Sequence, residues 1–66
     1  MRIELEKEDD DRWIAEVPEL PGVIVYAQNR ESAVAKVEAL ALRVLAERLE
    51  NDEAIPELNS FFTLPA

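Results

Sequence analysis

Residues 13–22, Trp13-Ile-Ala-Glu-Val-Pro-Glu-Leu-Pro-Gly22, combine a strand pattern with a turn signal. The first half of this stretch alternates, with Trp13, Ala15 and Val17 on one side and Ile14 and Glu16 on the other, which is typical of a half-buried β-strand. The proline after Val17 has no N–H to donate to a neighbouring strand, so it ends this strand. Pro21-Gly22 is a strong turn signal, because proline fixes φ and glycine is free to take a positive φ. The stretch therefore predicts a strand followed by a tight turn.

A second alternating segment precedes this strand. Residues 2–7 place Ile3 and Leu5 on one face and charged residues on the other, which predicts another half-buried strand. The acidic run from Glu8 to Asp11 breaks the alternation with residues that favour turns. Two alternating segments around a short polar link are typical of a β-hairpin.

A third strand and a long helix follow the turn. Residues 23–27 are β-branched, aromatic or small, and their unbroken apolar character predicts a strand covered on both faces. Asn29 is a favourable N-cap, and Glu31 lies in the first turn, where the helix dipole favours an acid. The sequence from Arg30 to about Glu50 has no Pro or Gly and is rich in good helix formers.

The predicted helix carries more apolar surface than one small sheet can cover. Steps of about 100° per residue place one broad stripe toward the sheet; it comprises Ala33, Val34, Val37, Leu40, Ala41, Val44 and Leu45. A second stripe comprises Ala35, Ala39, Leu42, Ala46 and Leu49. A charged strip of Lys36, Arg43, Glu47 and Glu50 remains for solvent. The second stripe therefore predicts a subunit interface, to which Tyr26 of the third strand is a candidate contributor.

The C-terminal part of the chain predicts a fourth strand. Residues 51–53 end the helix, Pro56 fixes a loop, and Ser60 to Leu64 has the composition of a strand. Phe61 and Phe62 are adjacent, so in a strand one fills the core while the other needs cover from a loop or a partner. The predicted fold class is α+β, in the order β-β-β-α-β, with a small antiparallel sheet covered by one helix. We expect residues 1–66 to form a single domain.

Composition restricts the function. A chain of 66 residues buries only about 60% of its unfolded surface, so the monomer should be marginally stable. With no cysteine and no histidine, the chain lacks disulfides and the commonest zinc ligands, and association is the remaining means of stabilisation. The net charge of −8 disfavours nucleic acids and anionic membranes and favours a basic protein partner, although it also keeps a small domain in solution. No signal peptide or membrane span is visible, so we expect a cytoplasmic protein.

Catalytic and metal-binding residues are scarce. Neither Ser32 nor Ser60 has a histidine to activate it, and a chain with one glycine cannot form a phosphate-binding loop. We therefore predict no catalytic residue, no cofactor and no metal. The run from Glu8 to Asp11 is the one candidate metal site, but it lacks the spaced carboxylates and turn glycine of a calcium loop, and a solvated turn is the simpler interpretation. Trp13 is interpreted as a core residue instead of a binding anchor, whereas Tyr26 fits either role.

The segment from Trp13 to Gly22 resembles the signature of HicB-like proteins, in which an aromatic strand runs into a Pro-Glu-Leu-Pro-Gly turn. The resemblance continues through an apolar strand, a polar N-cap and the helix start, and covers residues 1 to about 50. It implies a partial ribonuclease-H-like fold, commonly dimeric, and a role as an antitoxin that blocks HicA, a small basic mRNA-cleaving toxin. The matching residues look architectural, and they are Trp13, Ala15, Pro18, Glu19, Leu20, Pro21 and Gly22.

One departure from the HicB pattern concerns DNA. Many HicB antitoxins continue into a DNA-binding segment, and we expect no such C-terminal domain and no direct nucleic-acid binding here. Three hypotheses follow: an antitoxin-like module for a small basic toxin, a structural or sensory homo-oligomer without a toxin, and a metal-dependent hydrolase. We favour the first, with the second close behind.

Overall fold

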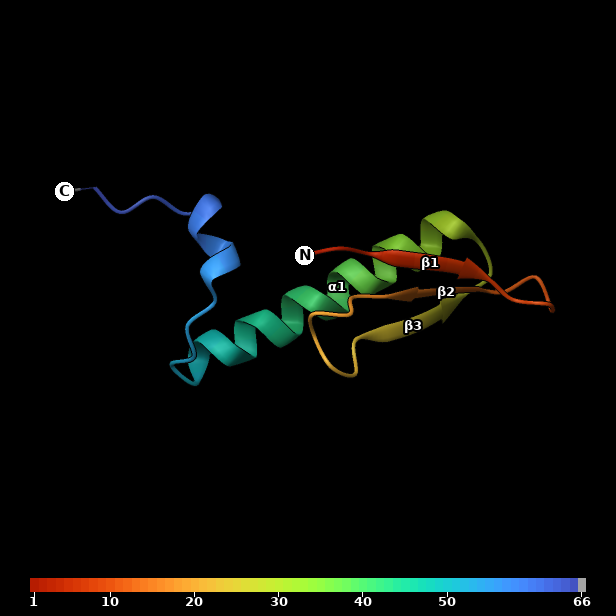
Figure 1. Cartoon of the computed structure of the whole chain (residues 1–66), viewed down its shortest axis with the longest axis horizontal. Helices are drawn as coiled ribbons and strands as arrows, with labels where there is room; N and C mark the ends of the chain where they lie inside the picture. The colour runs from red at the N-terminus through yellow and green to blue at the C-terminus, as the bar shows by residue number, and fades with distance from the viewer. Residues whose placement is uncertain (66) are drawn as a thin grey trace.

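The computed structural model describes residues 1–65 and has two layers, a three-stranded sheet and one long helix (Figure 1). The elements are β1 (Glu4–Lys7), β2 (Trp13–Glu16), β3 (Ile24–Ala27), α1 (Arg30–Glu50) and the 3-10 helix η1 (Pro56–Ser60). The helix packs across one face of the sheet, and the other face has no covering element (Figure 1). The predicted α+β class, a small antiparallel sheet covered by one helix, is confirmed.

The sheet is antiparallel throughout, with the order β1-β2-β3. Leu5 pairs with Ala15, and Ala15 pairs with Val25, so these three residues form a row across the sheet. Ala15 is fully buried, and Leu5 and Val25 pack against the same hydrophobic cluster. Since side chains alternate along a strand, this row and its neighbours two residues away face the helix.

The loop between β1 and β2 is closed by backbone hydrogen bonds and by side-chain contacts of its acidic residues. The N–H of Glu8 donates to the carbonyl of Arg12 at 2.7 Å, and the N–H of Asp11 donates to the carbonyl of Glu8 at 3.1 Å. Asp11 has a φ of 66°, a left-handed conformation that Asp tolerates better than most residues. Asp10 accepts from Nε of Arg12 at 2.8 Å. The predicted polar turn is therefore present, with ion pairs that hold it.

Two consecutive β-turns join β2 to β3, each with proline at its second position. The N–H of Leu20 donates to the carbonyl of Val17, and the N–H of Val23 donates to the carbonyl of Leu20, both at 3.0 Å. Gly22, the third residue of the second turn, has a φ of +84°, as a type II turn requires. Leu20, shared by both turns, is only 1% exposed. The two turns thus place the side chain of Leu20 in the core.

Both ends of α1 are capped by side chains or turns. Oδ1 of Asn29 accepts from the N–H of Ser32 at 2.8 Å, which confirms the predicted N-cap. At the other end, Asp52 adopts a left-handed φ of 62°. The N–H of Asp52 donates to the carbonyl of Leu49, and that of Glu53 to the carbonyl of Arg48, as in a Schellman motif. An aspartate occupies the position that glycine usually takes.

The core lies between the first part of α1 and the sheet, where the predicted inner stripe of the helix is found. Ala33, Val37 and Leu45 of that stripe are buried, and its other members are half-buried. The helix has 21 residues and spans about 31 Å, whereas a four-residue strand spans about 13 Å. The last turns of α1 therefore extend past the sheet by about 18 Å, and the molecule measures 51 × 20 × 14 Å (Figure 1).

The predicted fourth strand does not form among the described residues. Residues 56–60 form η1, for which proline at the first position is favourable. The carbonyl of Leu58 then accepts from the N–H groups of Phe61 and Phe62, which commits both amides locally. The prediction that one of these phenylalanines fills the core is also wrong, since they are 75% and 71% exposed. Nor is β3 covered on both faces, because Tyr26 is 49% exposed.

Candidate interaction surfaces

The polar and charged side chains of residues 1–65 lie at the surface. None of them is buried, and within these residues no group of three or more potential metal ligands converges. The acidic loop, the one candidate from the sequence, directs its carboxylates to cations of the same hairpin: Asp10 to Arg12 at 2.8 Å and Asp11 to Lys7 at 3.5 Å. The backbone N–H of Arg12, together with its side chain, lowers the pKa of Asp10. The candidate sites are therefore surfaces.

The signature segment, Trp13 to Gly22, forms β2 and the two turns that follow it. Ala15 is completely buried, Trp13 packs at the margin of the core, and Leu20 is the buried residue of the turn pair. Pro18 and Pro21 lie exposed at the turns that they initiate. A Cβ added at Gly22 would meet no atom within 4 Å, so the glycine serves the backbone conformation and not a close contact.

Glu19, the polar member of the signature, holds the N-terminal segment. Its carboxylate accepts from the backbone N–H of Arg2 at 3.3–3.4 Å and lies 3.6 Å from Nε of that residue. Its own backbone N–H and that of Arg2 lower the pKa of the carboxyl group. Glu19 thus ties the entry to β1 onto the turn between β2 and β3.

The second stripe of α1 is exposed along its whole length. Leu42 and Leu49 are 64% and 47% exposed, and the three alanines of the stripe are exposed as well. Tyr26 lies on the uncovered face of the sheet, with its ring 5.2 Å from the guanidinium of Arg12. The structure therefore separates the candidate interface residues: the helix stripe and Tyr26 lie on opposite faces of the two-layer fold.

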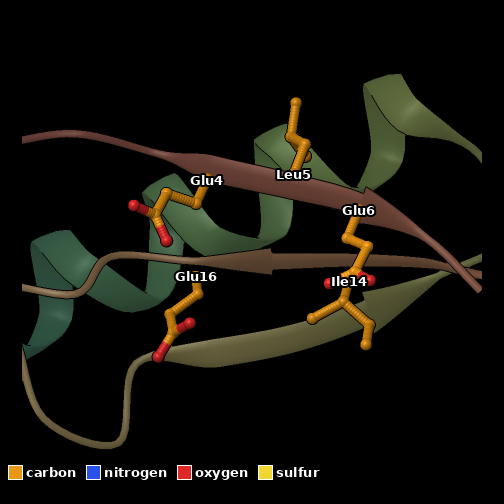
Figure 2. Close-up of a pocket in the computed structure, with 5 residues that line it drawn as sticks. All are labelled: Glu4, Leu5, Glu6, Ile14 and Glu16. Atoms are coloured by element: carbon orange, nitrogen blue, oxygen red, sulfur yellow. The ribbon is translucent and has the colours of Figure 1, made fainter.

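The open face of the sheet is a further surface, and the sequence alone did not predict it. It is acidic on the side of β1 and apolar on the side of β3, and its members are Glu4, Glu6, Ile14, Glu16, Ile24 and Tyr26. The close-up shows Glu4, Glu6 and Glu16 extending from two adjacent strands around Ile14 (Figure 2). Alternation in β1 and β2 predicts the outward positions of Glu4, Glu6, Ile14 and Glu16 but not those of Ile24 and Tyr26, and only the register reveals that all six meet. We call this set the open sheet face.

The carboxylates of the open sheet face are poorly compensated. Glu4 lies directly opposite Glu16, a pairing of like charges that destabilises a sheet. Glu4 has one ion pair, with Arg2 at 3.7 Å, whereas within residues 1–65 Glu6 and Glu16 have none. The acids are thus placed where they do not help the folded monomer.

Charge is distributed unevenly between the layers. Residues 1–29, which form the sheet and its loops, carry eight acidic and three basic side chains, a net charge of −5. The helix, residues 30–50, carries four of each sign and is neutral. Residues 51–66 add three acids and no base. The sheet side is therefore strongly acidic, while the exposed apolar stripe of the helix lies on a neutral element.

Comparison with known proteins identifies no relative. No protein-family model, no curated protein and no solved structure matches this chain. Across the described residues, no helix has both the length and the apolar character that a membrane crossing requires.

Proposed function

We propose that this chain is a HicB-like antitoxin module, which binds a small basic HicA-type mRNA-cleaving toxin in the cytoplasm and neutralises it by protein–protein contact. It acts without catalysis and without a cofactor. The proposal is supported by the signature from Trp13 to Gly22 and by the acidity of the sheet layer.

The observation that carries the proposal is the open sheet face. Its apolar part lies toward β3, with Ile24 and Tyr26 43% and 49% exposed, and its acidic part holds three carboxylates on β1 and β2. Adjoining charged and apolar residues are typical of protein interfaces, where the charges steer the partner and the apolar residues supply affinity. A partner that presents Arg or Lys side chains would also relieve the repulsion between Glu4 and Glu16.

This proposal is tested by removing the charge of the open sheet face. The toxin candidate is any short, basic protein encoded beside this gene, expressed alone and with the chain. The triple variant Glu4→Gln, Glu6→Gln, Glu16→Gln should slow association with it by roughly 10-fold at low salt, because steering depends on these charges. Co-expression with this variant should restore growth less well than co-expression with the unchanged chain.

A matched control separates local from overall charge. The triple variant Glu38→Gln, Glu47→Gln, Glu50→Gln removes the same number of charges from the helix. It should associate within about 2-fold of the unchanged chain, since these residues lie away from the open sheet face. Equal losses in both variants would show that only net charge matters. A neighbouring protein that does not arrest growth, or does not bind, would refute the antitoxin function.

The exposed stripe of α1 favours a second candidate, a structural or sensory homo-oligomer that has no toxin partner. Leu42 and Leu49 leave more apolar surface uncovered than a lone monomer needs. Sedimentation from about 1 to 300 μM tests this second candidate, because it requires self-association without any other protein. A chain that remains monomeric over that range would contradict it.

A further inference from the structure

The last described segment of the chain, residues 61–64, is apolar and uncovered. Phe61, Phe62 and Leu64 are 75%, 71% and 93% exposed, the highest values among the large apolar side chains of residues 1–65. The segment Phe-Phe-Thr-Leu contains residues that favour strands. We call residues 61–64 the C-terminal arm.

The sheet offers this arm an unusual edge. β3 lies at one side of the sheet and consists of Ile24, Val25, Tyr26 and Ala27, with no charged residue and no proline. Edge strands normally carry such residues because they prevent pairing with another chain. β1, at the other side, follows that rule with Glu4, Glu6 and Lys7 in four residues. The β3 edge is therefore suited to accept a strand.

The arm and the β3 edge of one molecule are far apart. Ile55 is buried and Leu58 packs against the hydrophobic cluster, so the chain before the arm is fixed near the end of the helix. That end lies about 18 Å beyond the sheet, while four extended residues reach about 13 Å. Figure 1 shows the C-terminal segment well separated from all three strands. Pairing within one molecule would require η1 to unwind.

We propose that the arm of one copy adds to the β3 edge of a second copy as its fourth strand, and that the second copy returns the exchange. A two-fold dimer satisfies both edges and both arms with the same contact. The two elements that meet, β3 and residues 61–64, carry no charged residue, although the sheet layer and residues 51–60 near them are acidic. This inference concerns self-association and does not depend on the proposed toxin partner.

A second copy is favoured over another protein because the chain carries both halves of the contact. The predicted fourth strand is present in the sequence, and the vacant edge is present in the sheet. An apolar groove lined by Leu49, Ile55, Leu58 and Phe62 connects the end of α1 to the arm, so the exposed stripe and the arm form adjoining parts of one surface. Burial of both in one interface removes the largest exposed apolar side chains of the chain from water.

Cysteine cross-linking tests the exchange directly, because the chain has no cysteine of its own. Tyr26→Cys protein is mixed with a second protein that carries one cysteine at position 61, 62, 63 or 64, and the mixture is oxidised. Side chains alternate in a strand, so cross-links between the two proteins should form in pairs, at 61 and 63 or at 62 and 64. Mass spectrometry identifies the joined peptides, and Asp9→Cys in the distant hairpin loop is the negative control. Equal yields at all four positions, or none, would overturn the proposal.

Proline substitutions at Thr63 and Leu64 provide the second test. Thr63 is exposed and outside regular structure, so Thr63→Pro should leave the monomer folded. Only alternate N–H groups of a strand face its neighbour, so Leu64→Pro is made as well, and one of the two variants removes an N–H that the pairing needs. Sedimentation should show at least a 10-fold weaker dimer for one of them, relative to alanine at the same position. A dimer that is unaffected by both proline variants, or a chain that is monomeric at 300 μM, would refute the exchange.

Salt distinguishes this inference from the proposed function. Dimerisation through uncharged strands of two acidic chains should persist or strengthen as NaCl is raised from about 50 to 500 mM, because salt screens the repulsion between the copies, whereas binding of a basic partner should weaken. A dimer that dissociates in salt would contradict the exchange while leaving the acidic docking surface intact.

Discussion

Substitution of Leu42 by glutamate is the most informative single change, because its effects on the monomer and on a dimer differ widely. Leu42 is 64% exposed on the second stripe of α1, so the monomer should lose no more than about 0.5 kcal/mol. Glutamate is also a good helix former. In a dimer that buries the stripe, the same change places a carboxylate in an apolar contact.

The size of the dimer effect follows from the exposed fraction. Complete burial of a leucine contributes about 1.5–3 kcal/mol, and roughly two thirds of this remains to be gained at Leu42. Loss of about 1–2 kcal/mol from each copy of a symmetric dimer gives about 2–4 kcal/mol, or an increase of roughly 30- to 1,000-fold in the dimer Kd. An unpaired carboxylate adds to this loss.

The assay is sedimentation equilibrium combined with circular dichroism. Lys36→Gln is the matched control, because it changes the net charge by the same one unit on the solvated strip of the helix. We expect Leu42→Glu to be folded and monomeric, and Lys36→Gln to be folded and dimeric. A dimer with unchanged Kd in Leu42→Glu would refute an interface on this stripe. It would leave the arm exchange to be judged by its own cross-links.

Three further predictions concern stability. Leu20→Ala should lower the free energy of unfolding by about 2–5 kcal/mol and leave most molecules unfolded at 25 °C in circular dichroism, whereas Leu20→Met should remain folded. A folded alanine variant would mean that the buried Leu20 of the two turns is not needed to stabilise the core. Asp52→Gly should raise the free energy of unfolding by about 0.5–1 kcal/mol in urea titrations, because the left-handed φ of 62° suits glycine; no gain would contradict the inferred strain. The pKa of Glu19 is lowered on folding, so its contribution to the free energy of unfolding is present above the unfolded value near 4.5 and is lost as the pH falls through the folded value. Acidification from pH 7 to pH 3 should therefore destabilise the unchanged chain relative to Glu19→Gln. Parallel pH profiles of stability for the two proteins would refute this.

Local patterns predicted most of the sheet and helix because each depends on near neighbours. The alternation around Ala15, the Pro21-Gly22 turn and the Asn29 cap involve residues within a few positions of one another, and all three are present in the structure. The fourth strand failed for a different reason. Strand propensity at 60–64 is local, but pairing needs an edge within reach, and the length of α1 together with Pro56 takes these residues away from it.

The candidate site was harder to predict than the fold. Glu4 and Glu16 are twelve residues apart, and only the antiparallel register places them opposite one another. The overall negative charge is evident from the sequence, but the arrangement of the acidic residues on the sheet layer is not. Tyr26 and Leu42 lie on opposite faces of one molecule for the same reason, since membership of a helix stripe or a strand face does not determine which side of the molecule each occupies.

The unequal lengths of helix and sheet have a consequence for how the monomer opens. Amide protons near Val37 lie over the sheet and should exchange with solvent only through global unfolding, whereas those near Leu49 can exchange through fraying of the overhanging turns. Anything that docks on the overhang would slow that second class alone. Slower deuterium uptake in the last turns of α1 would thus report that a partner is bound there, even before the partner is identified.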